Sequence, residues 1–403
     1  MNLEAAIDVL RAHRAARGLG PLPAAGRPRL PGSQAALRAL RDILPADQRW
    51  HADGDDMLAR LAGGRVLAIG LDASPQVNGS ATRDGALRRA SIDEGFARAV
   101  FELAVAMWSN PAFLPEVGPV PTALAAPSAF LPVPRGLEYV AASAQPGLPA
   151  LTRIDEVPLP GWLWQGLASM AAERLRAFER TALHAMRFML QHELGHVLLG
   201  HLEFVPSTAG RSLLEEAPGH ARPPSGTVAP GATAMRFEAR RAFEIEADRH
   251  AALALFAPTR TGGANGAATG ASSLALLGAI LAMVVFVARD VFEERADPGI
   301  THPPLWFRTH DIVATAFSSR QPAATGGLDS SPMGAQARAT LDRLLASVGA
   351  THPMIGEWVC PVADGRFSDS ARRVLKEARH ARADFLRGRV RVRETIVAAS
   401  APD

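Results

Sequence analysis

The stretch 188–201 constrains this chain more than any other, because it places two histidines four residues apart with a glutamate beside the first. His192, Glu193 and His196 form the pattern H-E-x-x-H. Positions i and i+4 lie one above the other on the same face of an α-helix, so both imidazoles could direct a ring nitrogen at one ion. Glu193 lies about 100° round the helix and could reach a water molecule at that ion without binding the ion. The spacing therefore predicts a helix with two metal ligands and a base.

A catalytic zinc site of this kind needs a third protein ligand. A multi-cysteine site is excluded, because Cys360 is the only cysteine. The pattern H-E-x-x-H-x-x-G-x-x-H is also excluded, because its glycine and third histidine would stand where the chain has Leu199 and Leu202. His201 is one place short of that position. It is expected either to support a ligand from behind or simply to lie at the helix end, where the helix dipole favours it.

A second helix, predicted over 236–256, carries Glu244 and Asp248 four positions apart. A carboxylate on this helix could complete a His2Glu set with the two histidines, and Glu244 is the candidate. Asp248 would then accept the free ring N–H of a ligand histidine and fix its tautomer. The alternative is a solvated helix face on which these acids pair with neighbouring arginines. The H-E-x-x-H pattern upstream favours the ligand interpretation.

Read in order, the motifs resemble the gluzincin peptidases that have E-x-x-x-D as their second motif. The features that carry the resemblance are H-E-L-G-H at 192–196, E-I-E-A-D at 244–248, an apolar helix, and T-H-P-P at 301–304 with Arg308. Their order and spacing are most similar to the phage-exclusion protein Lit family, because no membrane-spanning helices flank the motif. The resemblance covers 180–312 well and 65–110 weakly, and the chain departs from the pattern at 206–233.

The resemblance implies a zinc cofactor held by His192, His196 and Glu244, with Glu193 as the catalytic base that takes a proton from a metal-activated water. It further implies a protein substrate, so the chain would be a zinc-dependent endopeptidase, in phage defence or a stress response. The alternative function is a zinc-stabilised binding or sensor protein that performs no catalysis.

Two residues after the apolar helix are further candidates. In this resemblance His302 returns to the site, where it could donate to the oxyanion of a tetrahedral intermediate. A histidine before two prolines could equally belong to a rigid surface turn. Arg308 could stabilise the same oxyanion or pair with a carboxylate.

The whole chain is predicted to have an α+β fold that is mainly α. A helical N-terminal segment at 1–50 precedes a small α/β region at 51–160 with proline-rich loops. The zincin-like core follows at 161–320 and contains a flexible insertion at 206–233, either a flap over the cleft or disordered chain. A helical, basic C-terminal extension occupies 333–403.

Local patterns predict individual elements within these regions. A short apolar run between glycines and an aspartate predicts a strand over 65–71, and helical spacing of apolar residues predicts a helix over 92–108. A further strand is predicted over 137–141. Helical spacing without any proline predicts continuous helix over 162–201.

The longest apolar run, 274–288, would extend about 22 Å as a helix, against a hydrocarbon core of about 30 Å. It is therefore predicted to be a buried core helix, and no membrane span is expected. No basic and apolar leader is visible, so a cytoplasmic location is expected. The net charge of +3 gives no reason to expect a nucleic-acid partner. The arginine-rich stretch 372–393 could contact nucleic acid or an acidic protein, but a solvated helix face is the favoured interpretation.

Overall fold

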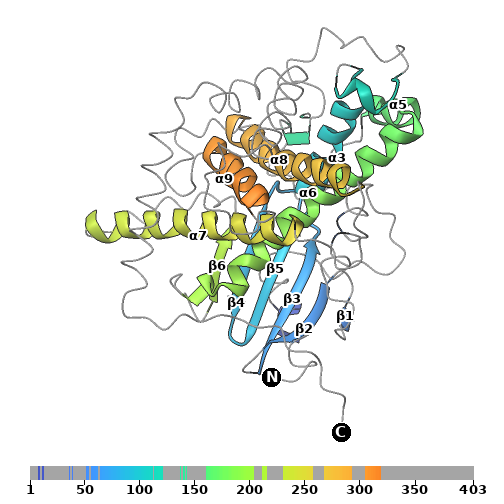
Figure 1. Cartoon of the computed structure of the whole chain (residues 1–403). Coiled ribbons are helices and arrows are strands. Elements are labelled where there is room, and N and C mark those ends of the chain that lie inside the picture. The colour runs from blue at the N-terminus through green and yellow to red at the C-terminus, as the bar shows by residue number, and fades with distance from the viewer. Residues whose placement is uncertain are drawn as a thin grey trace.

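A sheet and the helices packed on it make up the described part of the chain (Figure 1). The computed structural model describes six positions before residue 50 and then residues 51–318 with gaps. The gaps are 54–55, 62–63, 112, 121–136, 138, 141, 143–159, 204–210, 216–229, 257–266 and 293–304. Within these residues helix predominates and the sheet lies mainly in the N-terminal half, so the predicted α+β, mainly α class is confirmed.

Six strands of the described chain form the sheet, in the order β1-β2-β3-β5-β4-β6. The pair β3 and β5 is parallel, and every other neighbouring pair is antiparallel. The strands are β1 (His51–Asp53), β2 (Asp56–Leu61), β3 (Arg65–Asp72), β4 (Gly79–Asp84), β5 (Leu87–Asp93) and β6 (Arg211–Glu215). Strand β3 agrees with the strand predicted over 65–71.

Apolar residues on one face of the sheet belong to the main core. Side chains alternate between the two faces of a strand. Leu67, Ile69 and Leu71 of β3, with Ala90 and Ile92 of β5, belong to the same buried cluster as the helices. Leu58, Val66, Ala68 and Leu87 form a separate, smaller cluster. The helices, and with them the candidate site, are therefore packed on the first face.

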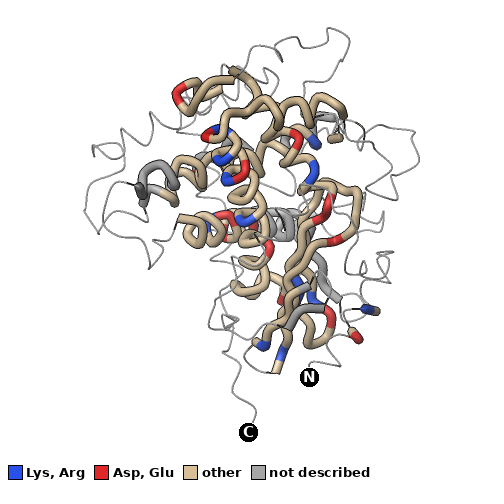
Figure 2. The backbone as a smooth tube through the Cα atoms, turned by 90° about the vertical axis from the view of Figure 1, so that its right-hand side faces the viewer, with Lys and Arg blue, Asp and Glu red and all other residues tan. Residues whose placement is uncertain are grey.

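The helices surround one long central helix, α6, which contacts α3, α7, α8 and strands β4 and β5. The helical elements are α3 (Glu94–Trp108), η2 (Pro115–Val117), α5 (Gly161–Ser169), α6 (Ala172–Leu198), η5 (His201–Glu203), α7 (Pro230–Phe256), α8 (Ala267–Phe292) and α9 (Leu305–Ser318). Acidic and basic positions are interspersed among them (Figure 2), and Arg249 of α7 pairs with Asp311 of α9 at 2.7 Å.

Helix α8 contains the apolar run 274–288, and its side chains lie in the main core, so the prediction of a buried core helix is confirmed. Gly278 brings α8 close to α6, because a Cβ at this position would lie 2.5 Å from the Cβ of His184. Among the described residues no helix combines the length and apolar character needed to cross a membrane.

The strand predicted over 137–141 is wrong, because Tyr139, Val140 and Ala142 are helical. A short apolar run does not distinguish strand from helix by periodicity alone. Tyr139 is held by α3 rather than by the sheet. Its backbone N–H donates to Glu102, and Arg98 lies over its ring at 4.6 Å. Its hydroxyl donates to the carbonyl of Pro75.

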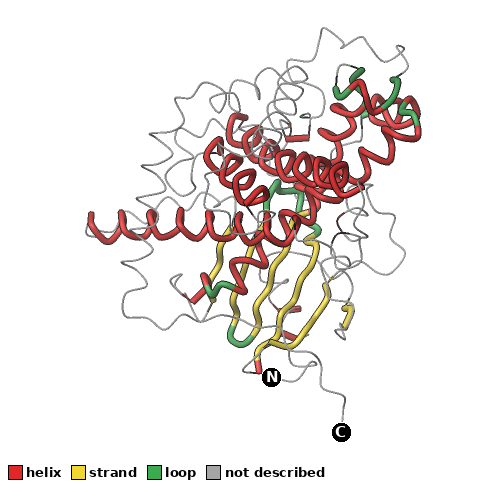
Figure 3. The backbone as a smooth tube through the Cα atoms, in the orientation of Figure 1, coloured by secondary structure: helices red, strands yellow, loops and turns green. Residues whose placement is uncertain are grey.

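Three other expectations differ from the structure (Figure 3). The helix predicted over 162–201 is interrupted at Met170 and Ala171, whose ψ angles of 133° and 156° are extended and separate α5 from α6. The insertion 206–233 is not irregular throughout, because Arg211–Glu215 forms β6 beside β4 and α7 already begins at Pro230. The helix predicted over 92–108 begins two residues later, since Ile92 and Asp93 end β5.

The described positions at the N-terminus, among them Val9 and Ala36, are helical as predicted for that segment. The predicted extension 333–403 lies outside the described residues. Buried apolar residues of 51–160 and of 161–320 belong to one cluster, so these two regions share a core.

Candidate metal centre

The last two turns of α6 place His192, Glu193 and His196 deep in the molecule. The helix has no proline, and the apolar residues around these turns, including Phe188 and Met189, are buried. The three polar residues have exposed fractions of 0%, 1% and 1%. Burial of polar and ionisable side chains is unfavourable unless each has partners. Three such residues on one buried stretch therefore need partners from other elements.

Helix α7 supplies these partners where it crosses α6. Glu244 and Asp248 lie one turn apart on α7, and both are 1% exposed. The crossing is close at Gly195, where a Cβ would lie 3.2 Å from the Cα of Ala247 and 3.2 Å from the Cβ of His250. A glycine between the base and the second histidine thus lets the acidic helix approach the ligand helix.

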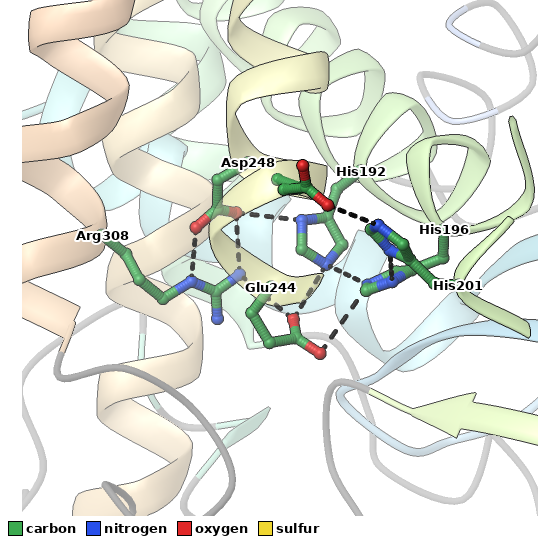
Figure 4. A network of polar contacts seen from close by, with 7 residues as sticks. His192, His196, His201, Glu244, Asp248 and Arg308 are labelled. Atoms are coloured by element: carbon green, nitrogen blue, oxygen red, sulfur yellow. Dashed lines mark hydrogen bonds and ion pairs between the residues drawn. The ribbon is translucent and has the colours of Figure 1, made fainter. Parts of the chain in front are cut away.

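The donor atoms of His192, His196 and Glu244 converge on one point (Figure 4). The two Nε2 atoms are 3.1 Å apart. Glu244 Oε2 is 3.2 Å from His192 Nε2, and its Oε1 is 3.7 Å from His196 Nε2. This buried His-His-Glu group could hold a metal ion, and it consists of the three ligands predicted from the sequence.

Asp248 lies behind His192, as predicted. The Nδ1 of His192 is 2.9 Å from Asp248 Oδ1. Arg308 of α9 donates to both carboxylate oxygens, at 2.7 and 2.9 Å (Figure 4). Burial by itself would raise the pKa of Asp248, but the Arg308 guanidinium and the His192 hydrogen bond outweigh it and hold that pKa below its ordinary value. The carboxylate is therefore ionised and fixes the orientation of His192.

Two roles were expected for Arg308, and the structure shows one of them, the pairing with a carboxylate, that of Asp248. Its Nη2 also lies 3.9 Å from Glu244 Oε2. His302, the other candidate on this part of the chain, lies outside the described residues.

The carboxylate of Glu193 lies against the sheet. It approaches the first residue of β4 so closely that a Cβ at Gly79 would lie 2.5 Å from Glu193 Oε1. The carboxylate therefore lies between the ligand helix and β4.

His201 lies behind His196, on the side of the ring away from Nε2. The Nδ1 atoms of His201 and His196 are 2.9 Å apart, and His201 Nε2 is 3.2 Å from Glu246 Oε2. The ring of Phe243 stacks on that of His201 with centroids 4.4 Å apart. Burial lowers the pKa of His201 to about 4, against the opposing effect of Glu246. His201 is thus neutral at neutral pH.

Sequence reasoning missed Glu246 and Phe243 as parts of this arrangement. Glu246 is two positions from a predicted ligand, on a helix face that carries several acids and arginines, so its residue type alone gave no signal. The spacing of His201 and Glu246, 45 residues apart, also follows no local pattern.

The chain gives no match to protein-family models, to curated proteins or to solved structures. Its functional assignment therefore depends on the site. The chain is an α+β protein with a buried His-His-Glu group that could hold a metal ion. A glutamate follows the first histidine in the sequence, and a second layer of hydrogen-bonded side chains surrounds the group.

Proposed function

We propose that this protein is a zinc-dependent endopeptidase with a zincin-like core of the gluzincin type. The observation that carries the proposal is the convergence of His192, His196 and Glu244, with Glu193 adjacent to the first ligand. Two histidines and one glutamate form the protein ligand set of catalytic zinc in several metallopeptidases, and this set leaves a coordination position for water or substrate.

The separations of the donor atoms support zinc. In a tetrahedral site with metal–ligand distances of about 2.0–2.1 Å, donor atoms lie about 3.3 Å apart. The two Nε2 atoms are 3.1 Å apart, and Glu244 Oε2 is 3.2 Å from His192 Nε2, so both distances lie close to that value. The other carboxylate oxygen of Glu244, Oε1, is the one that lies 3.7 Å from His196 Nε2. Asp248 also supports it. Because that ionised carboxylate accepts from His192 Nδ1, the Nε2 of the neutral ring carries a lone pair directed at the same point.

In the proposed reaction, bound zinc would polarise the peptide carbonyl and lower the pKa of a water molecule toward about 7. Glu193 accepts the proton of that water as it attacks the carbonyl carbon. It then delivers the proton to the leaving amine nitrogen as the C–N bond breaks, which yields a carboxylic acid and an amine. The remaining proton of the acid passes to the amine and gives a carboxylate and an ammonium group. His302 remains the proposed donor to the oxyanion. Asp248 and Arg308 hold the ligand His192 in place.

The substrate in this proposal is a protein, and the setting is phage defence or a stress response in the cytoplasm, in keeping with the resemblance to the Lit family. A substrate of this class would be found by comparing new protein N-termini in cells that express the wild type and the inactive Glu193→Gln variant.

The decisive variant is Glu193→Gln. It removes the base but neither a ligand nor much volume, so hydrolysis of unfolded protein substrates should fall by at least about 100-fold while zinc content stays at the wild-type level. Glu173→Gln, at a side chain 61% exposed on the same helix, is the matched control and should keep full activity. Addition of a chelator should abolish hydrolysis in the wild type, and added zinc should restore it. Undiminished hydrolysis by Glu193→Gln would contradict the assignment.

The complete burial of the site favours one alternative function. With ligands and base at most 1% exposed, the same residues could hold zinc as a structural element of a binding or sensor protein. The two functions differ in one result. A wild type that binds one zinc per chain and cleaves no denatured protein or peptide library would support the structural role.

A further inference from the structure

We propose that His201 and Glu246 form a hydrogen-bonded relay that orients the metal ligand His196 and fixes its tautomer. This inference rests on the proposed metal site. It assigns to His201 and Glu246 a positioning role, distinct from the support that His192 receives from Asp248.

The end of α6 explains how His201 reaches His196. The helix ends at Leu198, and the N–H groups of Leu199 and Gly200 donate to the carbonyls of Gly195 and Val197. Gly200 has a φ of 74°, a left-handed conformation that side-chain-bearing residues rarely adopt. The chain reverses there. His201, five positions after His196, is thereby turned back against it.

The turn that carries His201 is attached to the sheet. His201 begins η5, and Glu203 at the end of η5 pairs with Arg83 of β4 and, at 2.6 Å, with Arg88 of β5. Arg88 donates in addition to the carbonyls of Gly85 and Leu87. The stacked ring of Phe243 holds the plane of the His201 imidazole from the α7 side. His201 is thus fixed by the sheet on one side and by α7 on the other.

One arrangement of protons satisfies all the contacts once His196 binds a metal through Nε2. The Nδ1 of His196 must then carry the hydrogen and donate to His201 Nδ1. His201 consequently carries its own hydrogen on Nε2 and donates it to Glu246 Oε2. The negative charge of Glu246 thus acts on His196 through a neutral imidazole. Supports of this kind hold the ligand ring and increase its basicity.

The two histidine ligands would therefore be supported in different ways. Asp248 contacts His192 directly and is itself neutralised by Arg308, with both side chains at most 3% exposed. Glu246 contacts His196 only through His201, and its side chain is 19% exposed. The second support can therefore be altered without breaking a fully buried ion pair.

Zinc affinity, measured by competition with a chromophoric chelator on the full chain, tests the relay. His201→Phe keeps an aromatic ring against Phe243 and removes both nitrogens, so affinity should fall about 10- to 100-fold. Glu246→Gln keeps an acceptor oxygen and loses the charge. Because a hydrogen bond to a neutral acceptor is weaker than one to a carboxylate but is still made, zinc affinity should fall by only about a few-fold. In the double variant affinity should equal that of His201→Phe within about two-fold, because Glu246 acts through His201. Glu173→Gln is the control for the loss of a glutamate charge.

A second readout reports the tautomers directly. In the zinc-loaded wild type, nitrogen-15 NMR of the histidines should show the hydrogen on Nε2 of His201. A hydrogen on Nδ1 of His201 would overturn the relay. So would wild-type affinity in His201→Phe, or fully additive losses in the double variant. Failure of the wild type to bind zinc overturns both the relay and the proposed function. A wild type that binds zinc without peptidase activity overturns only the proposed reaction.

The turn itself has a matched pair of variants. Gly200→Ala and Gly64→Ala introduce a side chain at nearly equal φ, 74° and 73°, and a Cβ at Gly64 meets nothing within 4 Å. Both should unfold at a lower urea concentration than the wild type, by a similar amount. Only Gly200→Ala should weaken zinc binding as well. Equal affinity in the two variants would overturn the role of the turn in placing His201.

Discussion

Asp248 connects three helices through one carboxylate. It lies on α7, accepts from His192 on α6, and pairs with Arg308 on α9 through both of its oxygens. Breaking a buried ion pair by removing one partner costs several kcal/mol, because the other charge is left without compensation. This residue is therefore expected to contribute both to folding and to the properties of the candidate metal site.

Asp248→Asn separates these contributions. The amide keeps one acceptor oxygen but loses the charge, so we expect zinc affinity to fall about 10- to 100-fold and the protein to unfold at lower denaturant concentration. Asp311→Asn is the matched control, because Asp311 also pairs an arginine of α7 with α9 but contacts no ligand. It should lower stability and leave zinc affinity unchanged. Chelator competition and urea unfolding measure the two effects, and equal affinities in the two variants would refute the assignment to Asp248.

At the level of single residues, the predictable part of the site is the part determined by helix periodicity. His192 with His196, and Glu244 with Asp248, are i, i+4 pairs, and their shared faces follow from geometry alone. The chemistry of zinc ligand sets, in which two histidines need a third protein ligand, was the reason to expect that the two faces meet. The contact of His201 with Glu246 depends on how α7 packs on α6, and that of Arg308 with Asp248 depends on how α9 packs on α7. No local pattern contains that information.

At the level of elements, long apolar or periodic stretches were predictable, and strands with internal charge were not. Helices α6 and α8 have many apolar positions at helical spacing. Strand β5 contains Arg88 and Arg89, which composition would place on a surface. In the structure Arg89 is buried and donates to both oxygens of Asp72 at 2.8 Å. Because charged residues of this kind interrupt the apolar pattern, hydrophobicity alone does not predict the central strand β5.

The contact between α6 and α8 depends on one glycine, and this yields a prediction for the element scale. In Gly278→Ala the new Cβ would lie 2.8 Å from the backbone N of Ala185 and 2.9 Å from the carbonyl O of Thr181, so α8 must move. We expect a loss of about 1–3 kcal/mol in unfolding free energy, typical of overpacking. Gly161→Ala, whose Cβ meets nothing within 4 Å, is the control and should be neutral. Equal stability of the two variants would show that the contact is less tight than described.

For the molecule as a whole, the buried cluster that extends from β3 to α9 indicates that the sheet and the helices unfold together. Two half-buried histidines lie on helices of this cluster, and burial lowers the pKa of each. The pKa of His184 is lowered to about 4, first by burial and then by Arg187 and Arg180, and that of His250 is also lowered to about 4, chiefly by burial. Between pH 6.5 and about pH 4 the folded protein therefore binds fewer protons than the unfolded chain does.

The sign of the resulting pH dependence follows from these values. Above the ordinary histidine pKa of 6.5, His184 is neutral in both states and contributes no dependence. As the pH falls from 6.5 toward about 4, the unfolded chain takes up a proton that the folded chain does not, so the free energy of unfolding falls. The upper limit for one such group is on the order of 1 kcal/mol per pH unit.

His184 allows this to be tested away from the metal site. With chelator present, the wild type should lose stability between about pH 7 and about pH 5 in urea unfolding, and His184→Gln should lose less, because glutamine has no proton to exclude. Above about pH 7, where His184 is neutral in both states, the difference in stability between the two proteins should no longer change with pH. If His184→Gln lost as much stability as the wild type over this range, the pH dependence would have to come from the other buried groups, with His201 and His250 the next to be replaced.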